Sequence, residues 1–106
     1  MKTYDLQNMI KGWFVGDFDP VVLRSSDFEV AVKYYKAGDV ESLHVHKIAK
    51  EITVVVEGTV IMNGKTFKKG EIILLEPGEP TDFKVVDDAI TVVVKTPSAK
   101  ADKYLL

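Results

Sequence analysis

The segment HVHKIAKEITVVVEG, from His44 to Gly58, carries the most informative pattern of the chain. The chain has two histidines, and both stand here with one valine between them. Glu51 follows five residues after the second histidine and opens an almost wholly apolar run. A short run of β-branched residues is typical of a strand with at least one buried face. The stretch therefore predicts two strands, with the histidines at the end of one and the glutamate at the start of the next.

Short strands separated by turns are also expected along the rest of the chain. Alternating or β-branched segments predict strands over residues 28–36, 42–46, 51–56, 60–62, 65–67, 71–75, 82–86 and 89–96. Asn63-Gly64 predicts a hairpin, since both residues tolerate the positive φ of a type I′ turn. Only residues 4–11 have any helical spacing. This pattern indicates an all-β fold, either a sandwich, a jelly roll or a small barrel.

Length and composition indicate a single domain and argue against several classes of protein. The 106 residues predict a single domain, 1–106, with a barrel core over 28–96, an N-terminal arm over 1–20 and a C-terminal tail over 97–106. The net charge is −2 and no basic block occurs, so we expect no nucleic-acid partner. No apolar run reaches the roughly 18 residues of a membrane helix. Without cysteine there is no disulfide or thiolate nucleophile. The first residues have no long apolar core, so we expect a cytoplasmic protein.

The two histidines and the glutamate are candidate metal ligands. Side chains two apart on a strand point to the same side, about 7 Å apart along the backbone. His44 and His46 therefore project together, and Glu51 on the next strand can lie beside them. Two imidazoles and one carboxylate form the facial set that suits a divalent transition metal with open positions. An ordinary structural role for the two histidines is the alternative at this point.

Two glycines complete a motif around these residues. Gly38 stands six residues before His44 and Gly58 seven after Glu51, which gives G-x5-H-x-H-x4-E-x6-G. This pattern resembles the first motif of the cupin superfamily at every fixed position. The resemblance spans roughly residues 28–96 and implies a double-stranded β-helix, a small jelly-roll barrel with its site inside. It also implies that His44, His46 and Glu51 bind a divalent metal, usually Fe, Mn, Ni, Zn or Cu.

The second cupin motif, G-x5-P-x-G-x2-H-x3-N, is matched only in part. Gly70 starts it and Pro77-Gly78 resembles its turn, but no histidine or asparagine follows. An alignment on Gly78 puts Thr81 at the position of the fourth ligand. An alignment on Pro77, with one inserted residue, puts Asp82 there instead. We favour Thr81 as the residue that faces the cavity, since this alignment needs no insertion.

Several further residues are candidates for the site. Tyr34 and Asp82 are the only candidates for proton transfer that we find. Tyr34 shares its strand face with Val30 and Val32, and this apolar parity predicts that all three face the interior. Trp13 and Phe14 either line a ligand mouth or pack the arm onto the barrel, and we favour packing.

The C-terminal lysines are a separate candidate. Lys95 and Lys103 either bind an anion at the barrel rim or belong to a solvated tail, and we favour the tail.

Two classes of function fit these features. One is a metal-dependent enzyme that acts on a small molecule, of the dioxygenase or isomerase type. The other is a non-catalytic cupin that binds a small molecule or sugar, or a metal-free protein resembling the epimerases. Ile52, Val54 and Val56 are expected on the outer face, which needs a cover. Cupin-like chains commonly pair, so we expect a homodimer, with the N-terminal arm as the alternative cover.

Overall fold

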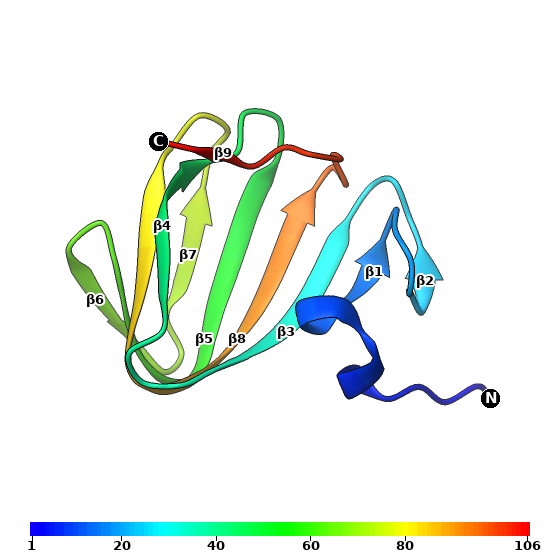
Figure 1. The fold of residues 1–106 in the computed structure, drawn as a ribbon, viewed down its shortest axis with the longest axis horizontal. Helices are drawn as coiled ribbons and strands as arrows, with labels where there is room; N and C mark the ends of the chain where they lie inside the picture. The colour runs from blue at the N-terminus through cyan, green and yellow to red at the C-terminus, as the bar shows by residue number, and fades with distance from the viewer.

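The fold was described from a computed structural model that covers all 106 residues. Its strands are β1 (Trp13–Gly16), β2 (Leu23–Arg24), β3 (Glu29–Tyr35), β4 (Val40–Val45), β5 (Lys50–Met62), β6 (Lys65–Lys68), β7 (Ile72–Leu75), β8 (Thr81–Thr96) and β9 (Tyr104–Leu105). Two 3₁₀ turns, η1 (Leu6–Asn8) and η2 (Ile10–Gly12), precede them (Figure 1). None of its helices is long and apolar enough to cross a membrane.

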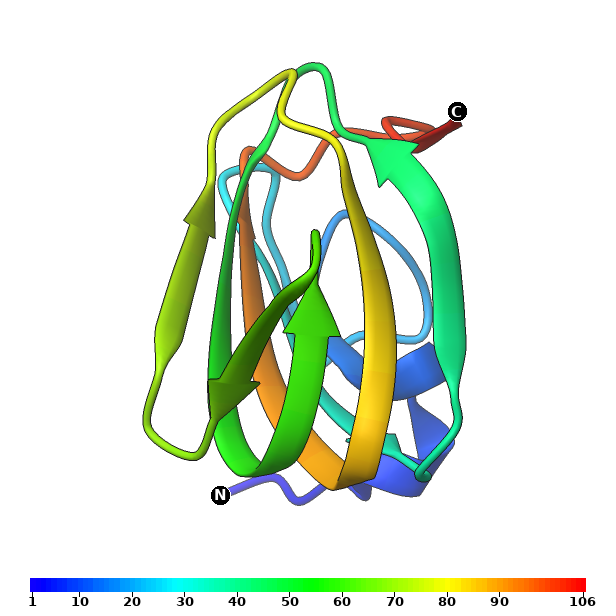
Figure 2. The same cartoon turned by 90° about the vertical axis from the view of Figure 1, so that its left-hand side faces the viewer.

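Two long strands give the molecule its double layer. β5 and β8 pair with each other antiparallel along most of their length, and both bend sharply part-way (Figure 2). The second half of β8 pairs with β3, whereas its first half pairs with β4. The first half of β5 pairs with β7 and its second half with β6. The bends therefore fold one sheet into two facing layers, and the expected all-β jelly roll is confirmed.

The bend explains a difference from the expected strands. The predicted strands 51–56 and 60–62 are one strand, β5, and the predicted strands 82–86 and 89–96 are one strand, β8. The pairing register shifts between Val55 and Val60, on either side of Gly58. A bulge of this kind bends a strand without ending it, so glycine and paired aspartates resemble turns in the sequence.

The predicted hairpin is confirmed. Asn63 and Gly64 have φ values of 50° and 76°, and Met62 pairs with Lys65 across the turn. The apolar core fills the bent end of the barrel. Its buried members come from β5, β7 and β8: Val55, Val60, Met62, Leu75, Phe83, Val85 and Ala89.

Both ends of the chain join the barrel. In the N-terminal arm, β1 pairs with β3, and η2 packs against β3. The C-terminal segment runs from the end of β8 across one end of the barrel to β4, where β9 pairs with His44 and Val45 (Figure 1). The tail thus covers the end of the barrel opposite the apolar core.

Candidate functional site

A cavity of about 200 Å³ lies between the two layers, above the apolar core. The inward faces of β3, β4, β5 and β8 line it, together with Trp13 of β1. All three predicted metal ligands, His44, His46 and Glu51, face this cavity. The structure therefore brings together His44 of β4, His46 directly after β4, and Glu51 of β5.

Backbone carbonyl groups fix both imidazole rings. Nδ1 of His44 lies 2.7 Å from the carbonyl oxygen of Ser42, and Nδ1 of His46 lies 2.7 Å from that of Asp102. A carbonyl oxygen only accepts, so each Nδ1 carries the hydrogen and donates it. The lone pair of each neutral ring is then on Nε2, the nitrogen free to bind an ion. The two rings, both buried, meet edge to face with their centres 5.5 Å apart.

Glu51 is the third member of this group. Its Oε2 lies 3.2 Å from Nε2 of His46, and its side chain is 12 % exposed. Burial raises the pKa of the Glu51 carboxyl, but the contact with His46 and the charge of Lys95 outweigh it, and the pKa lies below the ordinary value. The Glu51 carboxyl is therefore ionised, and its Oε2 faces Nε2 of His46.

Two imidazole nitrogens and a carboxylate oxygen are ligand types that divalent transition metals bind. Two ligands that each lie about 2.1 Å from one ion are about 3 Å apart at a right angle, close to the His46–Glu51 separation. As the side chains lie, however, no three histidine, aspartate or glutamate groups form an arrangement that holds an ion. Metal binding by the three residues is therefore a proposal.

The predicted orientation of Tyr34 is wrong. Tyr34 is 70 % exposed, while its neighbour Tyr35 faces the cavity and packs against Phe83, with ring centres 4.9 Å apart. Ala31 and Lys33 share the inward parity of Tyr35. The error has a physical reason. The inner wall of β3 is polar at the cavity, so the more apolar parity of this strand faces outward instead.

The outward parity of β3 belongs to an apolar outer surface. Val30 pairs with Val94 and Val32 with Val92. All four valines are half-buried, so this face of the sheet is apolar although it does not line the cavity. On β3, hydrophobicity alone therefore does not identify which alternate side chains face the cavity.

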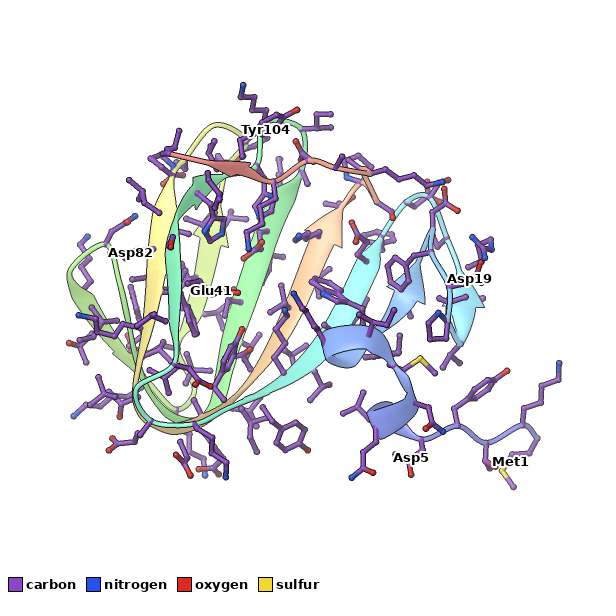
Figure 3. All side chains as sticks on the ribbon, viewed as in Figure 1. Met1, Asp5, Asp19, Glu41, Asp82 and Tyr104 are labelled. Carbon is purple, nitrogen blue, oxygen red and sulfur yellow. The ribbon has the colours of Figure 1, made fainter.

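Asp82 also lies away from the cavity. Its side chain is exposed and accepts a hydrogen bond of 2.8 Å from the backbone N–H of Asn63, beside the β5–β6 hairpin (Figure 3). Thr81 is 2 % exposed and pairs with His44, so its side chain is buried, but it is not among the residues that line the cavity. The Thr81 hydroxyl donates to the backbone oxygen of Asp82 at 2.6 Å. The structure thus does not bring Asp82 into the site.

Sequence reasoning missed Asp102. This buried residue lies in the C-terminal tail, and its carboxylate accepts hydrogen bonds of 2.9–3.1 Å from the backbone N–H groups of Lys47, Ile48 and Ala49. It therefore fixes the loop that joins His46 to Glu51. A single aspartate in a polar tail gives no local signal, because its partners are more than fifty residues away.

Trp13 and two lysines are further residues of the cavity. Trp13, which we expected to pack the arm, lines the cavity, and the ammonium groups of Lys33 and Lys95 each lie 5.0 Å from its ring centre. Lys95 is half-buried on β8 and not part of a solvated tail, whereas Lys103 is exposed in the tail although it also borders the cavity. Lys33 was missed because it stands on the strand whose parity was misassigned.

The chain matches no protein-family model and no curated protein sequence. Solved structures do resemble it. An uncharacterized conserved protein with a double-stranded β-helix domain from Klebsiella pneumoniae has a TM-score of 0.73 and 22 % identity, over 98 % of this chain and 90 % of that protein. The dimethylsulfoniopropionate (DMSP) lyase DddQ from Ruegeria pomeroyi has a TM-score of 0.72 and 19 % identity, over 88 % of this chain. Here the chain spans 49 % of the lyase, about half its length.

A third structure shares the fold. Oxalate decarboxylase from Bacillus subtilis has a TM-score of 0.66 and 18 % identity, over 77 % of this chain and 24 % of the decarboxylase. The chain has the fold of the cupin superfamily. The double-stranded β-helix implied by the motif around His44 is therefore confirmed. At identities this low, the likeness concerns the fold.

Proposed function

We propose that this cupin-fold protein binds a divalent transition-metal ion through His44, His46 and Glu51 and acts on a small molecule in the adjoining cavity. The ion is of the Fe, Mn, Ni, Zn or Cu class. When bound, it supplies a Lewis acid that polarises an oxygen of the substrate. The lyase and decarboxylase names of two proteins with this fold, and the Mn(II) centres of that decarboxylase, support the proposal.

One contact carries the proposal. Nε2 of His46 and Oε2 of Glu51 lie 3.2 Å apart, and the opposite ring nitrogen of His46 already donates to a carbonyl oxygen. A neutral ring and an ionised carboxylate would then face each other with two lone pairs, which is unfavourable in a buried site. A cation is needed between them, either a proton or a metal ion. His44 lines the same cavity and its Nδ1 is already engaged, so its Nε2 can serve as a third ligand. A third nitrogen or oxygen donor is needed for a metal ion but not for a proton, and we therefore favour the metal ion.

Other residues that line the cavity would contact a bound substrate. Phe83 and Val93 exclude water from one side of the cavity, and Tyr35 forms part of its floor. Burial raises the pKa of the Tyr35 phenol, so the hydroxyl stays protonated and can donate a hydrogen bond to a substrate oxygen. Tyr35 thus replaces Tyr34 as the tyrosine of the site, as a hydrogen-bond donor and not for proton transfer, and Asp82 has no role in this proposal.

Metal content tests the proposal. Protein purified without a metal-affinity column should contain one divalent ion per chain. His44→Ala and Glu51→Gln should each weaken metal binding by about a hundredfold or more, since the first removes a donor atom and the second replaces a charged oxygen with a neutral amide oxygen. Affinity should also fall in acid, because protons compete for the imidazole nitrogens.

Glu57→Gln is the matched control for Glu51→Gln. Glu57 lies on the same strand, but its side chain is exposed and pairs with Lys69 on the surface. The control should keep the metal content of the wild-type protein. Equal metal content in wild-type protein, His44→Ala and Glu51→Gln would contradict the proposed site.

A non-catalytic or metal-free cupin is the second candidate. Two observations favour it: no three donors converge as they lie, and Thr81, at the fourth-ligand position, donates its hydroxyl hydrogen to a backbone oxygen. In that case a proton joins His46 to Glu51, and the cavity holds a small molecule or sugar. Wild-type protein that contains no metal, and takes up none on dialysis, would decide for this candidate.

A further inference from the structure

Two lysines face the cavity without an acidic partner. Lys33 comes from β3 and Lys95 from the adjacent strand β8, and both are half-buried. Every ion pair of the chain involves other cationic groups. A half-buried ammonium group without a carboxylate partner costs stability. Two such groups in one cavity therefore need an explanation other than folding.

The charge of the cavity differs from that of the whole chain. The net charge of the protein is −2, yet four lysines and two glutamates line the cavity. Glu51 is engaged by His46, which leaves Glu41 as the remaining carboxylate. Burial lowers the pKa of Lys33; the negative charge of Glu41 opposes this effect and the positive charge of Lys95 adds to it. The cavity is thus cationic within an acidic protein.

The ammonium groups of Lys33 and Lys95 both contact the ring of Trp13. Each lies 5.0 Å from the centre of this ring, a distance at which the ring face attracts a cation. Lys33 pairs in register with Thr91, a fully buried residue that also lines the cavity. Two positive donors therefore lie beside the same ring at the wall of this cavity.

We propose that this cavity binds a small organic acid, whose carboxylate lies between the ammonium groups of Lys33 and Lys95. The proposal rests on the proposed function in taking this cavity as the substrate site, and it assigns the substrate class. A cavity of about 200 Å³ admits only a small molecule. No arginine or helix N-terminus lines it, and these features often accompany phosphate sites. A carboxylate suits two separate ammonium donors.

Fluorescence of Trp13 tests the proposal, since this is the single tryptophan of the chain. Metal-free protein is titrated with acetate, succinate, citrate, inorganic phosphate and succinamide, the neutral analogue of succinate. We expect at least one carboxylate to bind, and succinamide not to bind. Lys33→Met and Lys95→Met should each weaken carboxylate binding by about tenfold or more, because each removes a charged hydrogen-bond donor.

Lys84→Met is the matched control. Lys84 lies on β8 like Lys95, but its side chain is exposed, so the substitution should leave binding unchanged. Thermal unfolding checks the fold of each variant. Lys33→Met should unfold at a higher temperature than wild-type protein, because it removes a desolvated cation, whereas a merely structural lysine would give a lower temperature.

Carboxylate binding and metal binding can be tested independently. His44→Ala should lose the metal and still bind the carboxylate in the metal-free titration. A protein that binds metal but none of the three carboxylates, with or without the metal, overturns the substrate class and leaves the metal site standing. Binding of phosphate alone, equal binding of succinamide, or unchanged binding by both lysine variants also overturns the proposal.

Discussion

At the scale of single residues, Asp102 connects the C-terminal tail to the candidate metal site. Its carboxylate accepts three backbone hydrogen bonds from residues 47–49, and its carbonyl oxygen accepts from His46. Loss of the side chain leaves buried N–H groups unpaired and loosens the loop between two proposed ligands. Groups that orient metal ligands typically change metal affinity by about 10–100-fold. Asp102 is therefore a positioning residue of the proposed site.

Asp102→Ala should lower the free energy of unfolding by about 2–4 kcal/mol, since several charge-assisted hydrogen bonds are lost. It should also weaken metal binding by about tenfold. Urea unfolding and metal titration measure the two effects. Asp87→Ala, at an exposed aspartate on β8, is the control and should change neither. A variant as stable as wild-type protein would show that the tail does not hold the loop.

The stabilisation by Asp102 should depend on pH. Burial raises the pKa of its carboxyl, but the three backbone N–H donors outweigh burial, and the pKa lies below the ordinary value. A group whose pKa is lowered in the folded protein stabilises it above the unfolded pKa, here about pH 4, and loses this effect as pH falls through the folded pKa. The stability difference between wild-type protein and Asp102→Ala should therefore shrink below about pH 4.

Individual residues also show where the sequence predicts the site and where it does not. His44, His46 and Glu51 share one cavity as predicted, because strand alternation and a short loop suffice to bring them together. The predicted inward orientation of Tyr34 is wrong, because the side chains of β3 that face the cavity are more polar than those on its outer face. Asp102 reaches the site from the C-terminal tail, so no local pattern could have found it, whereas Trp13 was a candidate for a ligand mouth although packing was favoured.

At the scale of elements, the bend of β5 depends on Gly58. Gly58 has a φ of 88°, and a β-carbon there would lie 2.3 Å from the backbone oxygen of Asp88. At Gly58, β5 and β8 therefore lie too close together to admit a side chain. The sequence predicted the strands on either side correctly, but it could not distinguish a bend from a turn, since the distinction depends on pairing with a distant strand.

Gly58→Ala should lower the free energy of unfolding by about 2 kcal/mol or more, because it adds a backbone clash to the cost of a positive φ. Gly64→Ala is the matched control. Gly64 also has a positive φ, 76°, but a β-carbon there would contact nothing within 4 Å. Urea unfolding of both variants should therefore show the larger loss for Gly58→Ala. Equal losses would mean that the close approach to Asp88 relaxes without cost.

At the scale of the whole molecule, the sheet of β7, β5, β8 and β3 has two different faces. Its inner face carries the polar cavity, and its outer face carries cross-strand apolar pairs such as Ile52–Leu74 and Val54–Ile72. The predicted outward direction of Ile52, Val54 and Val56 is confirmed by the burial of Thr53 and Val55. The outer face needs a cover, since an apolar sheet surface of this kind rarely remains in water.

The N-terminal arm does not supply this cover over β5 and β7. η2 packs against β3, and the arm lies on the side of β3 away from β5 and β7 (Figure 1). Ile72 is 66 % exposed and Leu74 52 % exposed, on an edge strand that pairs only with β5. The strand β7 thus presents a row of apolar side chains. We propose that a second copy of the chain covers this face.

Sedimentation equilibrium should give a homodimer at micromolar concentration. The double variant Ile72→Lys/Leu74→Lys should be a monomer, because two charges on each copy would face an apolar surface from which water is excluded. Its circular dichroism spectrum should match that of wild-type protein, since both side chains point away from the core. Val40→Lys is the control, because Val40 is 66 % exposed but lies on β4 in the opposite layer. A wild-type monomer, or a double variant that still dimerises, would exclude this face as the contact between copies.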